Sequence, residues 1–122
     1  MKTMNAQFEL FQRECQKWVK FWGLLDWKIY YYHKDIGKNH GSCAASLPGK
    51  VCSLSLAVEA NEKLSNEDVR LTAFHEVAEL LIASLMVVAE TRCIGEQETT
   101  EAGHDIVRRL ENCVYERLKE NL

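Results

Sequence analysis

The 122-residue sequence lacks the features that mark membrane proteins and many nucleic-acid-binding proteins. It has a single proline and no apolar run near the roughly 18–20 residues of a membrane-spanning helix. Basic residues are not in excess, because 15 Lys and Arg stand against 18 Asp and Glu, for a net charge of −3. We therefore expect no membrane span and no nucleic-acid partner held on a broad basic face.

No C-x-x-C pair occurs among the cysteines, which are odd in number and widely scattered: Cys15, Cys43, Cys52, Cys93 and Cys113. This spacing argues against zinc ribbons, zinc fingers and a disulfide framework. Each cysteine is expected to be a small buried apolar residue in a reducing compartment. Cys43 and Cys52 are placed to approach each other across a predicted hairpin, but we expect no bond between them.

Length and composition predict one domain over residues 1–122. The sequence is 47% hydrophobic and 27% charged, which is typical of globular proteins, and it contains no repeat and no obvious linker. A chain of this length fits a single domain with its own core. The first ten residues, MKTMNAQFEL, show no secretory apolar region, so we expect a soluble, cytoplasmic protein.

The first half of the chain predicts a helix followed by three strands. From Met4 to Trp22, apolar residues recur at steps of three and four, and Gly23 is placed to end that helix. Residues 27–35 are rich in aromatic and β-branched side chains and predict a strand. Two more strands flank a turn at 47–50, and the second has an alternating apolar set: Cys52, Leu54, Leu56 and Val58.

The second half predicts two helices. Ser65 with Asp68 three positions later forms a variant of the capping box, which begins a helix over about 67–89. That helix becomes apolar nearly all round, so it is expected to be buried. A loop containing Gly95 leads to a last helix over about 100–120. The order α-β-β-β-α-α predicts an α+β domain whose small antiparallel or mixed sheet packs on helices.

Residues 73–81, AFHEVAELL, have the spacing of a metal site. Residues four apart on a helix share a side, so His75 and Glu79 project together, offset by about 40°. Glu76 projects about 100° from His75, close to a bound ligand without binding it directly. This is the arrangement of H-E-x-x-H, in which a glutamate accepts a proton from metal-bound water, but with Glu79 in place of the second histidine.

A third ligand is expected from the last predicted helix. His104 lies at the edge of that helix's apolar stripe, so it can face the core side. His75, Glu79 and His104 would supply two imidazoles and one carboxylate, the ligand set of the standard His₂Glu catalytic zinc site. Glu98 and Glu101 are alternatives to His104. We predict one Zn²⁺ bound by His75, Glu79 and His104, with Glu76 as the catalytic residue.

Plainer interpretations of the same residues stay open. His75 and Glu79 can form an i,i+4 polar pair on a solvated face, worth a few tenths of a kcal/mol. The apolar character of the helix argues against this, because burying such groups without partners is costly. Glu101 and His104 also have the E-x-x-H spacing of di-iron four-helix bundles, but the predicted strands argue against that fold.

These features resemble the minimal zincin-like metallopeptidase domains of the ImmA/IrrE and SprT-like kind, including short phage-encoded members. The resemblance covers about residues 26–112. It rests on a strand that begins with Trp27, a hairpin, a capped helix with AFHEVAELL and a later helix with E-x-x-H. There is no Cys-rich zinc ribbon and no basic tail, which separates the chain from the DNA-associated members.

The resemblance implies a zinc-dependent hydrolase that acts on a peptide or protein, with an edge strand that holds an extended substrate. His75 matches the first ligand, Glu76 the general base, Glu79 the position of the second ligand and His104 a downstream third ligand. Glu79 departs from the usual histidine. The alternative function is therefore a non-catalytic metal-binding or protein-interaction module, of phage origin, that keeps the fold.

Overall fold

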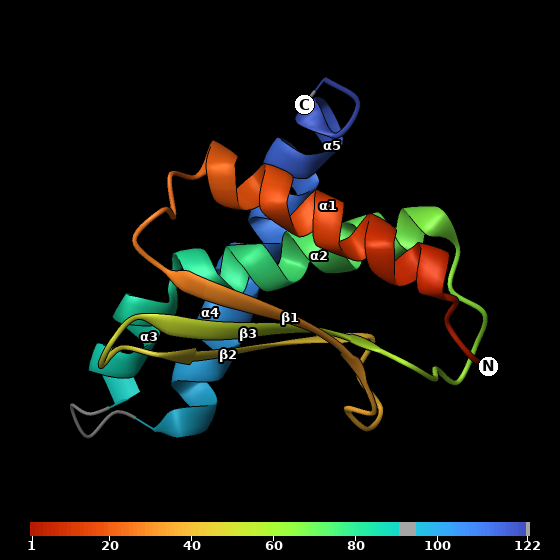
Figure 1. Cartoon of the computed structure of the whole chain (residues 1–122). Coiled ribbons are helices and arrows are strands. Elements are labelled where there is room, and N and C mark those ends of the chain that lie inside the picture. Colours follow the sequence, from red (N-terminus) through yellow and green to blue (C-terminus); the bar gives the residue numbers. More distant parts are fainter. Residues whose placement is uncertain (91–94, 122) are drawn as a thin grey trace.

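The computed structural model describes residues 1–90 and 95–121, and its elements follow the predicted order (Figure 1). The first half contains α1 (Asn5–Phe21), β1 (Lys28–Lys34), β2 (Gly41–Ser46) and β3 (Val51–Ala57). The second half contains α2 (Asn66–Leu81), α3 (Ala83–Glu90), α4 (Glu96–Leu110), a π-helical turn (Glu111–Tyr115) and α5 (Glu116–Leu118). The chain is an α+β protein, as predicted.

The sheet is mixed and has three strands in the order β1-β3-β2. The central strand β3 pairs in parallel with β1 and antiparallel with β2. A four-residue turn at 47–50 joins β2 to β3. Since β3 occupies the middle, β1 and β2 are the two edge strands. The chain reaches this order by crossing from β1 to the far edge before it returns through β3.

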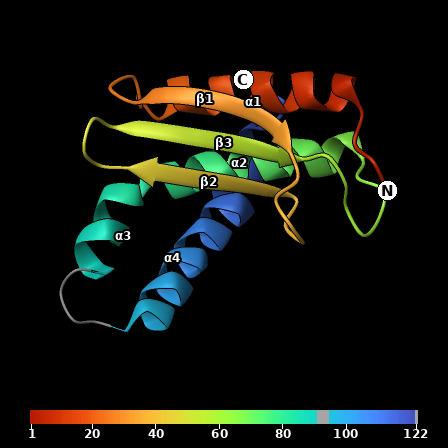
Figure 2. The ribbon, with the colours of Figure 1, turned by 60° about the horizontal axis from the view of Figure 1, so that its bottom comes forward.

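Helices α1 and α2 cover one face of the sheet, and α3 and α4 lie beside the β2 edge (Figure 2). The covered face carries the alternating apolar set of β3, and Cys52, Leu54 and Leu56 are fully buried there, as the sequence predicts. Helix α1 adds the buried side of its stripe: Leu10, Phe11, Cys15 and Trp18. These residues and the apolar side of α2 form one core.

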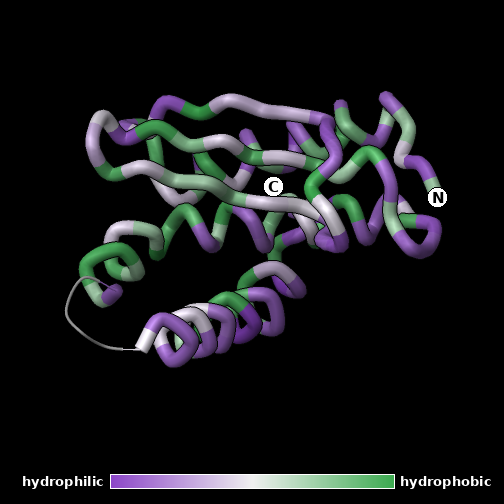
Figure 3. The backbone as a smooth tube through the Cα atoms, turned by 90° about the horizontal axis from the view of Figure 1, so that it is seen from below, coloured by the Kyte–Doolittle hydropathy of each residue, from purple (hydrophilic) through white to green (hydrophobic). Residues whose placement is uncertain are grey.

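The predicted helix over 67–89 is wrong as a single element, because it is broken at Ile82 into α2 and α3, bent by 54°. An unbroken helix of that length would extend about 35 Å, well beyond strands of about 23 Å. The expectation that this helix is buried holds for α2 but is wrong for α3, in which only Ala83 is buried and Leu85 and Val88 are 61% and 49% exposed. The apolar α3 lies beside the largely hydrophilic α4 (Figure 3). Among the described residues, no single helix is long and apolar enough to span a membrane. Only α2 and α3 taken together have the length and apolar composition of a span, and they are bent relative to each other.

The last helix starts earlier than predicted, at Glu96 instead of about residue 100. Glu96 and Glu98 lie in its first turn, where carboxylates interact favourably with the helix dipole.

Four of the cysteines are described and all four are free: Cys15, Cys43, Cys52 and Cys113. The sulfurs of Cys43 and Cys52 do approach each other, to 3.7 Å. Cys93 lies outside the described residues.

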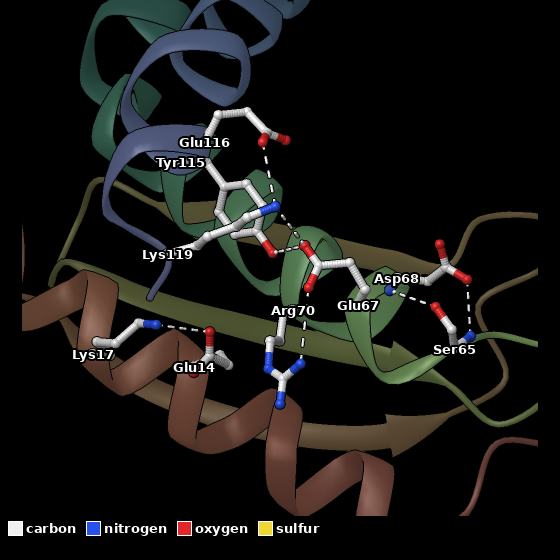
Figure 4. Close-up of polar contacts among 9 residues, drawn as sticks. All are labelled: Glu14, Lys17, Ser65, Glu67, Asp68, Arg70, Tyr115, Glu116 and Lys119. Carbon is white, nitrogen blue, oxygen red and sulfur yellow. Dashed lines mark hydrogen bonds and ion pairs between the residues drawn. The ribbon is translucent and has the colours of Figure 1, made fainter. Parts of the chain in front are cut away.

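A polar network fastens the C-terminal segment to the first turn of α2 (Figure 4). The hydroxyl of Tyr115 donates a hydrogen bond to Glu67 at 2.8 Å, and Lys119 also reaches Glu67. The ring of Tyr115 is buried against Phe74 and Trp18, with ring centroids 5.2 and 6.1 Å away. The turn after α4 is therefore held against α2, directly beside the segment that contains His75.

The capping box at the start of α2 predicts a pH-dependent loss of stability. The backbone N–H of Ser65 donates to the Asp68 carboxylate, and the backbone N–H of Asp68 donates to the Ser65 hydroxyl. The bonds from Ser65 lower the pKa of Asp68, so the ionised carboxylate stabilises the fold. Asp68→Asn should lower the free energy of unfolding by about 0.5 kcal/mol above about pH 4, measured by urea unfolding, because the carboxylate is exposed and its charge is screened.

That difference should shrink as the pH falls through the lowered pKa of Asp68, because both proteins then lack the charge. Glu62→Gln, in the exposed loop before α2, removes one carboxylate without touching the cap and is the matched control. An Asp68→Asn effect of equal size at pH 3 and pH 7 would contradict this account.

Candidate metal centre

His75, Glu79 and His104 come together beside α2, as the sequence predicts. His75 and Glu79 lie one turn apart on α2, and His104 reaches them from α4. The Nε2 atoms of His75 and His104 lie 3.6 and 3.3 Å from the same oxygen of Glu79, Oε1. One ligand atom from each of the three lies within 4.8 Å of the other two. Neither Glu98 nor Glu101 belongs to this cluster.

The spacing of these atoms fits a zinc ion. Zinc ligands at about 2.0–2.2 Å in a tetrahedron lie about 3.3–3.6 Å from one another, and both contacts to Glu79 are of that length. Two imidazole nitrogens and one carboxylate oxygen are also a donor set that zinc accepts. The three side chains therefore fit one zinc ion, and a fourth position would be left for water or substrate.

Glu111 contacts the cluster, and the sequence analysis overlooks it. Its Oε2 lies 2.9 Å from Nδ1 of His75 and accepts a hydrogen bond from that nitrogen. This leaves Nε2 of His75 facing Glu79. An outer carboxylate of this kind fixes the tautomer and the ring orientation of a metal-binding histidine. Glu111 follows His104 by seven residues, which is two helical turns, so the same spacing rule that relates His75 to Glu79 would have found it.

Local backbone structure helps to place Glu111. It is the first residue of the π-helical turn, and such turns occur often at functional sites. Tyr115 ends the same turn and is anchored in the core, 1% exposed. The anchor fixes the turn at one end while Glu111 meets His75 at the other. The hydrogen bond between Glu111 and His75 is therefore supported by the packing of Tyr115 against the neighbouring Phe74 of α2.

Glu76 lies beside the cluster with only 5% of its surface exposed. Burial, and then a hydrogen bond to Glu79, raise its pKa to about 9. The raised pKa of Glu76 favours its protonated form, which donates a hydrogen bond to the Glu79 carboxylate. Burial disfavours the ionised form of Glu79, but the ion pair with His75 and the hydrogen bond from Glu76 outweigh it and lower the pKa of Glu79.

His75 completes this balance of charge. Its hydrogen bond to Glu111, and then the nearby carboxylate of Glu79, raise its pKa to about 10. The metal-free cluster thus holds protons on His75 and Glu76, close to the carboxylates of Glu79 and Glu111. A divalent cation can take the place of such protons, because metal ligands bind in their deprotonated forms.

A cleft of about 510 Å³ lies next to the cluster, between the start of β2 and helices α2 and α4. Gly41, in β2, brings that strand close to α2. A Cβ atom at this position would lie 2.6 Å from Cγ2 of Thr72 and 3.2 Å from Cγ of Glu76. Glycine therefore allows the edge strand to pass directly over the buried general-base candidate.

A smaller cavity of about 280 Å³ adjoins the cleft and shares Cys43, Glu79 and His104 with it. Its apolar wall comes from Ile82, which directly precedes α3, and from three residues of α3: Ala83, Met86 and Val87. We refer to it as the apolar recess. It places an apolar surface directly beside the polar cluster.

Replacement of Glu111 should weaken metal binding. Glu111→Ala removes the acceptor that orients His75, and outer partners of this kind typically contribute about 10–100-fold in metal affinity. We therefore expect a loss of that size in zinc affinity, measured by competition with a chromogenic chelator. Glu111→Gln keeps an amide oxygen that can accept from Nδ1 and should lose less.

Glu101→Ala is the matched control, because Glu101 is an exposed α4 carboxylate that contacts Gln97 instead of His75. Equal zinc affinity in the Glu111→Ala and Glu101→Ala proteins, with both folded by circular dichroism, would exclude a role for Glu111 at the site.

Comparisons of the chain with protein-family models, with curated proteins and with solved structures give no match. The resemblance to zincin-like peptidases therefore stays a prediction from the sequence. The functional argument rests on the geometry around His75, Glu79 and His104.

Proposed function

We propose that the protein is a zinc-dependent hydrolase that acts on a peptide or protein. One observation carries this proposal: a buried glutamate, Glu76, lies beside the cluster of His75, Glu79 and His104 at the wall of an open cleft. A structural metal site needs neither the cleft nor the extra glutamate. A hydrolytic site needs both, because substrate must enter and a base must accept the proton of water.

Zinc held by His75, Glu79 and His104 would polarise the substrate carbonyl and make water more acidic. Glu76 would act as the general base that takes the proton from the attacking water. A nearby divalent cation favours the ionised form of Glu76, which burial otherwise disfavours. After the attack, Glu76 holds the proton and can return it to the leaving amine. Glu111 keeps the His75 ring in a fixed orientation throughout.

The position of β2 supports a peptide as substrate. It is an edge strand, and its residues 41–43 line the cleft. Edge strands carry backbone groups that can pair with an extended peptide as an added strand. A peptide bound in this way would pass the metal cluster, and the apolar recess lies where it could take an apolar side chain of the peptide. This combination favours peptides over compact small molecules.

The alternative function is a non-catalytic metal-binding module, and one observation favours it. The carboxyl of Glu76 is hydrogen-bonded to Glu79, so it already has a partner inside the cluster. A glutamate with only that role would stabilise the site without activating water. The two functions therefore differ in what Glu76 does.

Glu76→Gln separates the two functions. Glutamine has the same shape and can still donate a hydrogen bond to Glu79, but it cannot accept the proton. We expect the variant to keep its zinc and to lose at least about 100-fold in the rate of peptide hydrolysis, measured on a mixture of quenched fluorogenic peptides. Glu96→Gln, an exposed glutamate in the first turn of α4, is the control and should keep full activity.

If the zinc-loaded wild-type protein cleaves no peptide or protein, or if Glu76→Gln cleaves as fast as wild type, the hydrolase proposal fails. If the wild type, Glu76→Gln and Glu96→Gln proteins all bind zinc equally and none of them cleaves a peptide, the result would instead support the non-catalytic module.

A further inference from the structure

The face of the sheet opposite α1 and α2 carries an exposed aromatic and basic strand. Along β1, the outward side chains are Lys28, Tyr30, Tyr32 and Lys34. The two tyrosines are 42% and 41% exposed, which is high for side chains in the middle of a strand. In Figure 2 this face is turned toward the reader, and no helix of the described chain crosses it.

The positions beside the two tyrosines on this face carry small side chains. In the register of the sheet, Tyr30 lies beside Ser53, and Tyr32 lies beside Ser55. On the other side of β3, these serines pair with Ala44 and Ser42 of β2. Each tyrosine therefore stands at the edge of a platform of small side chains. Ser53 is half-buried and Ser55 is buried, so the open part of this face lies along β1, where an extended ligand can lie.

The charge of this face differs from that of the whole chain. The three strands contain no Asp or Glu, although the net charge of the chain is −3. Lys28 and Lys34 bracket the two tyrosines, with their ammonium groups 5.9 and 5.0 Å from the ring centroids of Tyr30 and Tyr32. The face therefore presents two aromatic rings between two cations.

We propose that this face binds single-stranded nucleic acid. Bases would stack on Tyr30 and Tyr32, and the flanking phosphates would bind Lys28 and Lys34. Exposed aromatic side chains on a sheet, combined with basic residues, are a general means of binding unpaired bases. Residues two apart on a strand lie about 6.5–7 Å apart on the same face, so two successive unstacked bases can each meet one ring.

The chemistry of the face favours this ligand over other anions. An acidic peptide would match the lysines but offers no flat surface for the tyrosine rings. A duplex hides the faces of its bases within the stack. The whole-chain charge predicted no nucleic-acid partner, but that prediction assumed a broad basic face, whereas single-strand binding of this kind needs only a short basic and aromatic stripe.

The test measures binding of fluorescein-labelled 12-nucleotide dT and rU strands, and of a 12-base-pair duplex, by fluorescence anisotropy at low salt. Wild type should bind a single strand more tightly than the duplex. Tyr30→Ser with Tyr32→Ser should lose at least about tenfold in affinity, whereas Tyr30→Phe with Tyr32→Phe keeps the rings and should bind like wild type. Tighter binding of rU or of dT identifies the preferred sugar, and either supports the proposal.

The lysines have a separate signature. Lys28→Gln with Lys34→Gln should reduce the slope of log affinity against log salt by about 1.4, since each phosphate contact contributes about 0.7 for single strands. Lys20→Gln with Lys63→Gln removes the same charge from exposed positions outside the sheet and is the control. His75→Ala should bind nucleic acid like wild type, so this proposal and the hydrolase proposal can fail independently.

Three results would overturn the proposal: no binding of either single strand at low salt, equal binding of the duplex and the single strands, or unchanged affinity in the Tyr→Ser variant. The last result, with binding of heparin as tight as that of the oligonucleotides, would show only general attraction of polyanions to lysines. Circular dichroism of each variant shows whether a loss of binding comes from unfolding.

Discussion

The candidate metal centre depends on one electrostatic constraint: Glu79 is ionised in a partly buried position between the imidazoles of His75 and His104. Burial disfavours its charge, and the ion pair with His75 and the hydrogen bond from Glu76 offset that cost. His104 adds a further contact to the same oxygen at 3.3 Å. The remaining features of the site follow from this arrangement, because Glu111 orients His75 and Glu76 keeps a proton that it shares with Glu79. A single cation among these groups would satisfy all of them.

The fold supplies this arrangement through close packing around α2. Gly41 allows β2 to pass over Glu76, because a Cβ atom there would lie 2.6 Å from Cγ2 of Thr72 and 3.1 Å from the backbone oxygen of Ser55. The bend at Ile82 turns α3 away from the line of α2, so that α4 can return alongside and present His104 to Glu79. The anchored Tyr115 then fixes the next turn of the chain. Gly41 and the bend at Ile82 thus allow the edge strand and α4 to approach α2 closely.

The sequence predicted those features that follow from the spacing of residues within one element. The capping box at Ser65 and the shared side of His75 and Glu79 follow from helical geometry, and the apolar alternation of β3 follows from the geometry of a strand. The sequence did not predict the break at Ile82, because the apolar pattern continues through it without a proline or glycine to mark the bend. It also left the sheet open between antiparallel and mixed, since both kinds of pairing have the same alternation.

The case of Glu111 is different, because its spacing from His104 was visible in the sequence. It was overlooked because a glutamate on the polar side of a helix is ordinary until a histidine from another helix is known to face it. The outward tyrosines of β1 show a similar limit. Alternation separates Tyr30 and Tyr32 from Tyr31, but only the arrangement of the helices shows which side remains uncovered.

X-ray absorption at the zinc K edge of the zinc-loaded protein is the most direct test of the central claim. The account predicts one zinc per chain in a four-coordinate shell of nitrogen and oxygen atoms at about 2.0–2.1 Å, with two imidazoles. His104→Ala should lose one imidazole from that shell. Sulfur ligands at about 2.3 Å, which Cys43 and Cys52 would supply, would contradict the account. A zinc content no higher than that of His75→Ala would contradict it as well.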